Sequence, residues 1–194
     1  MKKILISIKP KYVVKILNGE KTLEIRKNAP KDLPCEVYIY CTKENAKYFI
    51  DNKIYNAMMK GKVVAKFTLN KAEEIEWFRE SEPLLDYYHI VERLKNEELL
   101  EKARLTLEEL KEYLGVKGYY SDSLGWNFKK GYAWHIDNLV IFDRPKELKE
   151  FKKVASKRTY TNLSWLEPSQ KVIFKSLAPL THAPQSWQFC EVDE

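Results

Sequence analysis

The sequence predicts an α+β domain built around a mixed or antiparallel β-barrel of about five or six strands. Short segments with alternating apolar residues recur along the chain, and helical segments separate them without the strand–helix–strand order of parallel sheets. No internal repeat is visible, which excludes solenoids and propellers. With 194 residues, the chain has the length of one domain that buries its own core.

Six segments have the alternation of strands, with β-branched and aromatic residues. They are residues 4–8, 22–27, 36–42, 62–69, 132–142 and 185–192. In the second of them, Leu23 and Ile25 alternate with polar residues, so the two kinds of side chain point to opposite sides.

Apolar spacing and end signals predict the helices. The first begins at Pro10, whose missing N–H would be unsatisfied there anyway, and it ends at Asn18-Gly19. Thr106 and Glu109 form the capping box of another helix, which Gly115 ends. Further helices are expected over residues 43–59, 82–104 and 145–154, and a loop over 116–131.

The net charge of +6 is distributed unevenly. Residues 1–70 hold 15 Lys and Arg against 6 Asp and Glu, whereas residues 71–115 hold 7 against 13. A basic region suits a polyanion such as nucleic acid, because each neutralised phosphate releases counterions. A Lys-rich genome produces the same excess without any partner, so charge alone leaves both explanations open. We expect the acidic segment to face away from bound phosphate.

The sequence gives no support to several functional classes. No apolar run approaches the roughly 18 residues that span a bilayer, and the first apolar run is too short for a signal peptide. Three cysteines, a low and odd number, favour the reducing cytoplasm. Histidines and cysteines lack ligand spacing, and no Ser-His-Asp arrangement or phosphate-binding glycine loop is present. We therefore expect a cytoplasmic protein with no membrane partner, cofactor or metal.

The segment Gly19-Glu20-Lys21-Thr22-Leu23-Glu24-Ile25-Arg26 carries most of the chemical information. It joins the end of a helix to a strand and presents an ammonium, a hydroxyl, a carboxylate and a guanidinium within a short stretch. An ordinary exposed strand face with a weak ion pair between Glu24 and Arg26 has the same composition. The residues alone favour that structural interpretation.

The same segment resembles the Gly-x-Lys-x-x-Glu-x-Arg core of the ASCH domain family. The resemblance covers about residues 3–150, including the strand over 36–42, the segments 61–65, 109–114 and 132–136, and Arg144-Pro145. It implies a PUA-like barrel flanked by helices, with the motif lining a cleft at the barrel mouth. We expect residues 1–150 to form this domain, with a helical insert near 82–105. Residues 151–194 are expected to be a C-terminal extension that packs on the barrel.

The resemblance implies RNA binding and a role around translation or transcription. A small bacterial branch of the family hydrolyses N4-acetylcytidine with a threonine nucleophile and a lysine base. Lys21 matches that lysine, but Glu24 occupies the place of the threonine, and the equivalence of Thr22 is not supported. Binding of RNA or a nucleotide is therefore one hypothesis. Hydrolysis of a modified nucleoside or of single-stranded RNA, with these three residues as catalytic groups, is the alternative, and a protein-interaction module is a third.

The candidate binding residues combine cations for phosphates, aromatic rings for stacking bases, and polar groups near the barrel mouth. Glu24 is the candidate for reading a base edge, because a carboxylate accepts a hydrogen bond from cytosine N4. Arg26 could contact phosphate or hold Glu24 in place. The full set is Lys9, Lys21, Glu24, Arg26, Tyr40, Thr42, Trp126, Lys129, Lys130, Ser186 and Trp187. Packing in a core is the alternative role for each aromatic ring.

Overall fold

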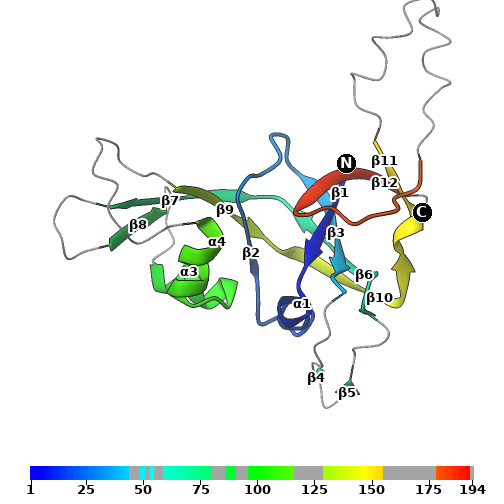
Figure 1. Ribbon diagram of the computed structural model, residues 1–194, viewed down its shortest axis with the longest axis horizontal. Coiled ribbons are helices and arrows are strands. Elements are labelled where there is room, and N and C mark those ends of the chain that lie inside the picture. Colours follow the sequence, from blue (N-terminus) through cyan, green and yellow to red (C-terminus); the bar gives the residue numbers. More distant parts are fainter. Residues whose placement is uncertain are drawn as a thin grey trace, which may run out of the picture.

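The computed structural model describes residues 1–43, 49–50, 53–54, 59–79, 86–90, 96–115, 129–154 and 178–192. Within these ranges the chain forms two main β-sheets, a two-stranded hairpin and three α-helices (Figure 1). The two sheets are joined where β9 of one leads directly into β10 of the other. No helix in the described ranges has the length and apolar character needed to cross a membrane.

The larger sheet has six strands. In spatial order they are β10 (Asp137–Glu147), β6 (Lys62–Leu69), β3 (Cys35–Cys41), β1 (Lys2–Ile8), β12 (Trp187–Val192) and β11 (Phe151–Lys153). β1 and β3 are parallel, whereas the other neighbouring pairs are antiparallel. The last strand along the chain therefore lies next to the first, and the two are paired residue by residue.

The smaller sheet has four antiparallel strands. In spatial order they are β2 (Leu23–Arg26), β9 (Lys129–His135), β7 (Ala72–Arg79) and β8 (Asp86–Ile90). The chain leaves this sheet at Ile136, and Asn138 then has a φ of 50°, a left-handed conformation that asparagine adopts more readily than most residues. This change of direction carries the chain from β9 into the edge strand β10 of the larger sheet.

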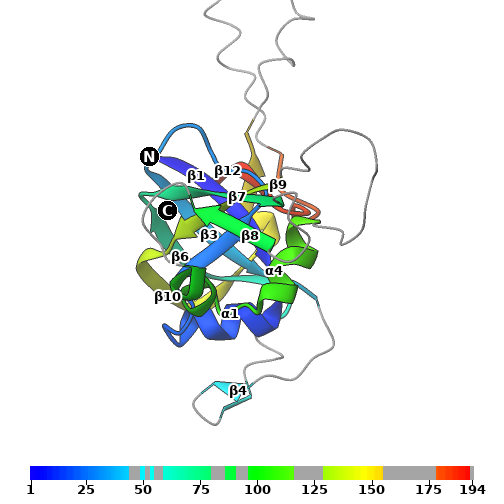
Figure 2. The same ribbon diagram turned by 90° about the vertical axis from the view of Figure 1, so that its left-hand side faces the viewer.

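The helices cover one face of each sheet. α1 (Pro10–Leu17) packs on the larger sheet, where Val13 and Ile16 join the largest buried cluster. α3 (Asn96–Ala103) and α4 (Leu107–Leu114) pack on the smaller sheet through residues such as Leu99 and Leu110. Figures 1 and 2 show α1 below β1 and β3, and Figure 1 shows the α3–α4 pair beside β9. β2 lies between these two helical layers, with its four residues all buried.

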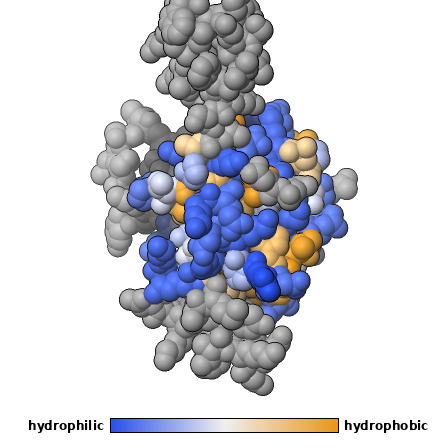
Figure 3. All heavy atoms as spheres, turned by 90° about the vertical axis from the view of Figure 1, so that its right-hand side faces the viewer, coloured by the Kyte–Doolittle hydropathy of each residue, from blue (hydrophilic) through white to orange (hydrophobic). Residues whose placement is uncertain are grey.

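The opposite face of the larger sheet has its own buried cluster, which includes Leu5, Tyr38, Tyr40, Phe151 and Val192. Strands from the first and last parts of the chain contribute to it together. On the side of the molecule seen in Figure 3, hydrophilic side chains cover most of the described surface, and hydrophobic ones form separate patches.

Several sequence predictions are confirmed. The α+β class is correct, as are the strands predicted over 4–8, 22–27, 36–42, 62–69 and 185–192. α1 begins at Pro10, and Gly19 follows it with a φ of 73°. In α4 the Thr106 hydroxyl accepts from the Glu109 N–H, and the Glu109 carboxylate accepts from the Thr106 N–H. Gly115 ends this helix with a φ of 76°.

Two of the helices predicted in the first two thirds of the chain are wrong over part of the residues that the structure describes. Within 43–59, Phe49–Ile50 (β4) and Lys53–Ile54 (β5) pair as antiparallel strands. Within 82–104, Asp86–Ile90 is strand β8, so the expected helical insert is helical only in α3. β7 supplies the antiparallel partner for β8, and such pairing overrides a weak local preference for helix.

The prediction for residues 116–154 also needs correction. β9 begins at Lys129, inside the expected loop, and the strand expected over 132–142 is broken at Ile136. The helix expected from Pro145 is absent: β10 runs to Glu147, a 3₁₀ turn (η1) follows at Leu148–Glu150, and β11 comes next. Pro145 is tolerated in β10 because an edge strand has one side without a ladder partner. The domain boundary near residue 150 stays a prediction.

Candidate functional site

The end of α1 positions the motif. Gly19 adopts the left-handed conformation, which glycine reaches without the strain of a Cβ atom. The N–H groups of Glu20 and Lys21 then both donate to the Lys15 carbonyl at 2.9 Å, so the chain turns sharply from helix to strand. Lys21 thereby enters the space between α1 and α3 directly before β2 begins.

Three charged side chains of the motif form a buried ionic triad. The Glu24 carboxylate lies between two cations, with Oε2 at 3.4 Å from Lys21 Nζ and Oε1 at 3.1 Å from Arg26 Nη2. The exposed fractions are 3% for Lys21, 7% for Glu24 and 5% for Arg26. The interpretation of this strand as an ordinary exposed face is therefore wrong. Buried charges of this kind need partners on all sides, because their desolvation is costly.

Backbone carbonyls from distant segments complete the coordination of the two cations. Lys21 Nζ donates to the Ala103 carbonyl at 2.6 Å, at the end of α3. Arg26 Nη2 donates to the Ser7 carbonyl in β1 at 2.8 Å. The triad thus connects the larger sheet, the smaller sheet and the α3–α4 pair.

Burial changes the proton affinity of the triad's lysine. Desolvation lowers the pKa of Lys21 and outweighs the opposing attraction of the Glu24 carboxylate, and the nearby charges of Arg26 and Lys15 lower it further. Tyr12 contributes its ring at 5.4 Å from the same Nζ atom. Burial also raises the pKa of Tyr113 on α4, against the influence of Arg26. The site therefore holds a lysine that is more easily deprotonated than usual.

Two hydrogen-bond donors at the triad are buried without a partner among the described residues, namely Arg26 Nε and Trp134 Nε1. Trp134 is the direct register partner of Glu24 across the β2–β9 pair. Side chains of such opposed residues lie on the same face about 4.5–5.5 Å apart at Cβ. A buried donor without an acceptor is costly, so these two N–H groups mark a place where an acceptor atom would be stabilised.

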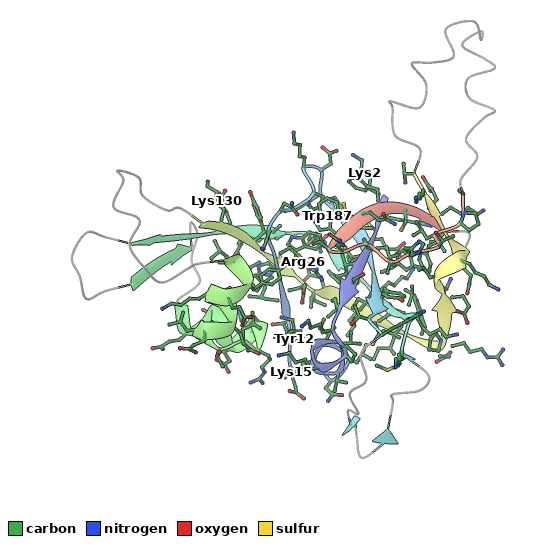
Figure 4. The ribbon with its side chains drawn as sticks, viewed as in Figure 1. Lys2, Tyr12, Lys15, Arg26, Lys130 and Trp187 are labelled. Carbon is green, nitrogen blue, oxygen red and sulfur yellow. The ribbon has the colours of Figure 1, made fainter. Side chains whose placement is uncertain are left out.

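The C-terminal strand brings two further predicted residues to the triad. The Ser7 N–H donates to the Ser186 carbonyl at 3.0 Å, while the Ser7 carbonyl accepts from Arg26. Trp187 packs its ring edge-on against Trp134, with 5.7 Å between centroids, and its Nε1 donates to Asn28. Figure 4 shows Trp187 next to Arg26 in the middle of the molecule. Lys21, Glu24, Arg26, Ser186 and Trp187 thus belong to one region.

Other predicted residues lie elsewhere. Thr22 is exposed, unlike its motif neighbours, although its backbone N–H donates to the Lys102 carbonyl. Tyr40 is 5% exposed and packs in the cluster on the opposite face of the larger sheet. Thr42 follows β3 and donates its N–H to Ile8, while its buried hydroxyl has no partner among the described residues.

The predicted lysines are also dispersed. Lys9 is exposed at the start of α1. Lys130 pairs with Glu74 across the β7–β9 ladder at 2.6 Å, away from Arg26 in Figure 4. The backbone of Lys129 belongs to β9, whereas its side chain and the whole of Trp126 lie outside the described residues.

The acidic segment, which was expected to face away from bound phosphate, contacts the motif directly. Its helices contact the motif through Ala103 and Lys102, whose carbonyls accept from Lys21 Nζ and from the Thr22 N–H. Glu109 of α4 accepts hydrogen bonds from Lys11 at 2.8 Å and from the Tyr12 hydroxyl at 3.2 Å. The acidic helices therefore cover the triad on the side of Lys21. Hydrogen bonds from Lys11 and Tyr12 of α1 to Glu109 hold α4 in this position.

Sequence reasoning missed several groups at the site. Ser7 and Ala103 act through backbone carbonyls, which no sequence pattern marks as functional. Tyr12 and Tyr113 lie at apolar positions of their helices, where a core role is the simplest explanation. Of these groups, Trp134 could have been considered from the sequence, because a tryptophan in a predicted strand usually needs a hydrogen-bond partner for its N–H when it is buried.

The described residues contain no group of three or more His, Cys, Asp and Glu side chains arranged to hold a metal ion. All three cysteines are buried, and burial raises the pKa of Cys190 to about 12. The Cys190 thiol is therefore a poor nucleophile and a poor metal ligand.

Comparison with solved structures identifies the fold. The chain matches the crystal structure of an ASCH protein from Zymomonas mobilis with a TM-score of 0.50 and 16% sequence identity, over 97% of this chain and 87% of that one. A single-substitution variant of that protein matches with a TM-score of 0.50 and 14% identity, over the same shares. No family model and no curated protein matches the sequence. The ASCH fold implied by the motif is thus confirmed at the level of structure.

Proposed function

We propose that this protein binds RNA or a nucleotide and holds one base against the ionic triad and Trp134. The observation that carries the proposal is the pair of buried donors without partners in the described part of the chain, Arg26 Nε and Trp134 Nε1, on two residues that neighbour Glu24 in the β2–β9 pair. A nucleobase edge presents carbonyl and ring-nitrogen acceptors next to amino donors. Such an edge would satisfy the two N–H groups and donate to Glu24.

The geometry of the triad suits recognition of a base better than neutralisation of a phosphate. Glu24 already lies between Lys21 and Arg26, so the region around the triad has little excess charge. The acidic helices α3 and α4 lie on the Lys21 side, which disfavours a phosphate there. The phosphate groups would instead extend toward the side of Trp187 and Lys2, where residues of the basic N-terminal region lie.

The proposal is tested by filter binding of mixed-sequence single-stranded RNA at 50 and 200 mM salt. We expect binding that weakens with salt, because each phosphate contact releases counterions. Replacing Glu24 by Gln should weaken binding by about tenfold, since one good base contact contributes roughly 1–3 kcal/mol, and circular dichroism checks that this variant is folded in the assay. Glu98→Gln, which changes an exposed pair with Lys102 on α3, is the matched control. Absence of RNA and nucleotide binding at 50 mM salt would refute the proposal.

Hydrolysis of an N4-acetylcytidine-like nucleoside, or of single-stranded RNA, is a second candidate function. The lowered pKa of the buried Lys21 favours it, because a neutral amine accepts a proton from an attacking hydroxyl or water. Thr22 is a weak candidate for the nucleophile, since its side chain is exposed while Lys21 is buried. A water molecule oriented by Glu24 would suit the motif better.

This second function is tested by incubating the protein with N4-acetylcytidine and with single-stranded RNA, followed by chromatography of the products. Turnover that is lost in Lys21→Met and kept in Thr22→Ala would support hydrolysis by Lys21 and water. Turnover that persists in Lys21→Met would exclude the mechanism.

A further inference from the structure

Three aromatic rings form a continuous strip from the triad to the surface. Trp134 is fully buried, Trp187 is partly buried, and Phe189 is 37% exposed. Their ring centroids are 5.7 Å apart for Trp134–Trp187 and 5.6 Å apart for Trp187–Phe189, in edge-on contacts. The inner end of the strip carries the Nε1 donor that has no partner, and the outer end reaches solvent.

The register of β12 explains why the strip lies on one face. Trp187 opposes Ile6 of β1, and Phe189 opposes Ile4, so both rings lie on the same side of the larger sheet. Cys190 and Val192 point to the other side and are buried in its core. Phe189 is therefore the outer end of the strip, in contact with Trp187 and partly open to solvent.

A lysine side chain lies next to the outer end of the strip. Lys2 Nζ lies 5.6 Å from the centre of the Phe189 ring and also pairs with Asp32, and both partners of this pair are exposed. In Figure 4, Trp187 lies between Arg26 and Lys2, so the strip leads away from the acidic α3–α4 pair.

We propose that the outer part of the strip, Trp187 and Phe189, binds the nucleotides that flank the recognised base, so that the ligand is a single-stranded RNA rather than a free nucleotide. This inference rests on the proposed function of the triad. Stacking of a base on an exposed ring stabilises binding and depends little on sequence, and a lysine next to the ring suits the adjoining phosphate. The occupant is single-stranded because bases in a duplex are already stacked on one another.

The inference is tested with fluorescein-labelled mixed-sequence hexaribonucleotides by anisotropy, and with the four nucleoside monophosphates by tryptophan fluorescence. We expect the hexamer to bind more tightly than any monophosphate. Phe189→Ala should weaken hexamer binding roughly 5- to 150-fold and leave monophosphate binding unchanged. Val140→Ala, at another exposed apolar position, is the matched control. Thermal melting checks that both variants fold.

The outcomes separate the two proposals. If monophosphates bind and the hexamer gains nothing, or if Phe189→Ala binds the hexamer like the wild type, the strip has no role and the triad proposal survives. If neither ligand binds the wild type, both proposals fail. A deoxyribose hexamer that binds more tightly than the RNA would overturn the assignment of the ligand as RNA.

Discussion

At the scale of single residues, the central feature is a carboxylate buried between two cations. Glu24→Gln should destabilise the fold by about 3–5 kcal/mol, because it leaves Lys21 and Arg26 buried without their shared negative partner. Lys21→Met should cost less, since Glu24 then keeps Arg26. Urea unfolding of both variants checks the order, and equal stability of Glu24→Gln and the wild type would contradict the ionic role of the triad.

The lowered pKa of Lys21 predicts a dependence of stability on pH. Below that pKa the lysine is charged in both the folded and the unfolded chain, and burial of the charge opposes folding. Between the lowered pKa and the ordinary value of 10.5, the unfolded chain binds the proton more tightly, so stability rises with pH.

Urea unfolding of the wild type and Lys21→Met, compared between pH 7 and 10, measures this effect. The wild type should gain stability relative to the variant as the pH rises. A constant difference across this range would show that Lys21 keeps its proton in the folded chain.

At the scale of the elements, the packing of α4 on β9 depends on Gly131. A Cβ atom at this position would lie 2.6 Å from Leu114 Cδ2 and 3.4 Å from the Arg26 carbonyl. Gly131→Ala should therefore cost about 1–3 kcal/mol and shift α4 away from β9. Gly115→Ala, where a Cβ atom would meet nothing within 4 Å, isolates the separate cost of a left-handed backbone. Thermal melting of both variants makes the comparison.

A second contact between elements connects α1 to the start of α4. Glu109 accepts from Lys11, Tyr12 and the Thr106 N–H, and these bonds lower its pKa to about 2. The depressed pKa contributes stability above the ordinary value of 4.5, and this stability is lost as the pH falls toward 2. The wild type should therefore lose stability relative to Glu109→Gln across this window. The effect should stay below about 1 kcal/mol, because the pair is partly exposed.

Denaturant unfolding at pH 2, 3 and 5 measures this difference. Glu98→Gln on α3 supplies the control, since its pair with Lys102 lies within one helix and does not join two elements. If the wild type loses more stability on acidification relative to Glu98→Gln than relative to Glu109→Gln, the α1–α4 contact is not the source of the effect.

The elements that sequence predicted correctly are those with local signals. Pro10 and Gly19 delimit α1, and the capping box delimits α4, because these signals act within a few residues. β7 and β8 were not predicted, since what stabilises them is pairing with each other and, for β7, with β9, which is far away in the chain. The glutamates of Ala72–Arg79 favour helix locally, yet Ile75 is fully buried in the smaller sheet.

The same distinction applies to the site. Lys21, Glu24 and Arg26 could be chosen from their spacing in one strand, and Ser186 and Trp187 from the expectation that the last strand closes near them. Their burial could not be foreseen, because the covering groups Ser7, Ala103 and Trp134 come from three other elements. Tyr40 was predicted to bind a base with its ring, but the ring is buried in the same cluster as Phe151 and Val192.

At the scale of the whole molecule, a basic region and an acidic region lie on different sides of the triad. The basic N-terminal strands meet the aromatic strip, whereas the acidic segment supplies the helices that cover Lys21. Binding of a polyanion should therefore depend on the strip side alone. Lys2→Gln should lower RNA affinity and reduce its salt dependence by about one phosphate contact, while Lys102→Gln should leave both unchanged. Filter binding across a salt series distinguishes the two variants.

The whole-molecule role of the C-terminal region can be tested by ending the chain at Glu150. β11 and β12 would be lost, and β1 would become an edge strand whose partner on one side is missing. Phe151, Leu180 and Val192 would leave the cluster around Leu5. Each such side chain contributes about 1.5–3 kcal/mol by burial, which together approaches the roughly 5–15 kcal/mol stability of a whole domain.

The truncated chain should therefore fail to fold, with no cooperative melting transition in circular dichroism. Phe151→Ala in the full chain tests the same contacts more gently, and it should cost about 3–5 kcal/mol because the ring is fully buried. If the truncated chain melts cooperatively, residues 151–194 are an extension added to a complete domain. If it does not, the C-terminal strand is part of the core, and the aromatic strip that it carries is fixed in place by the fold itself.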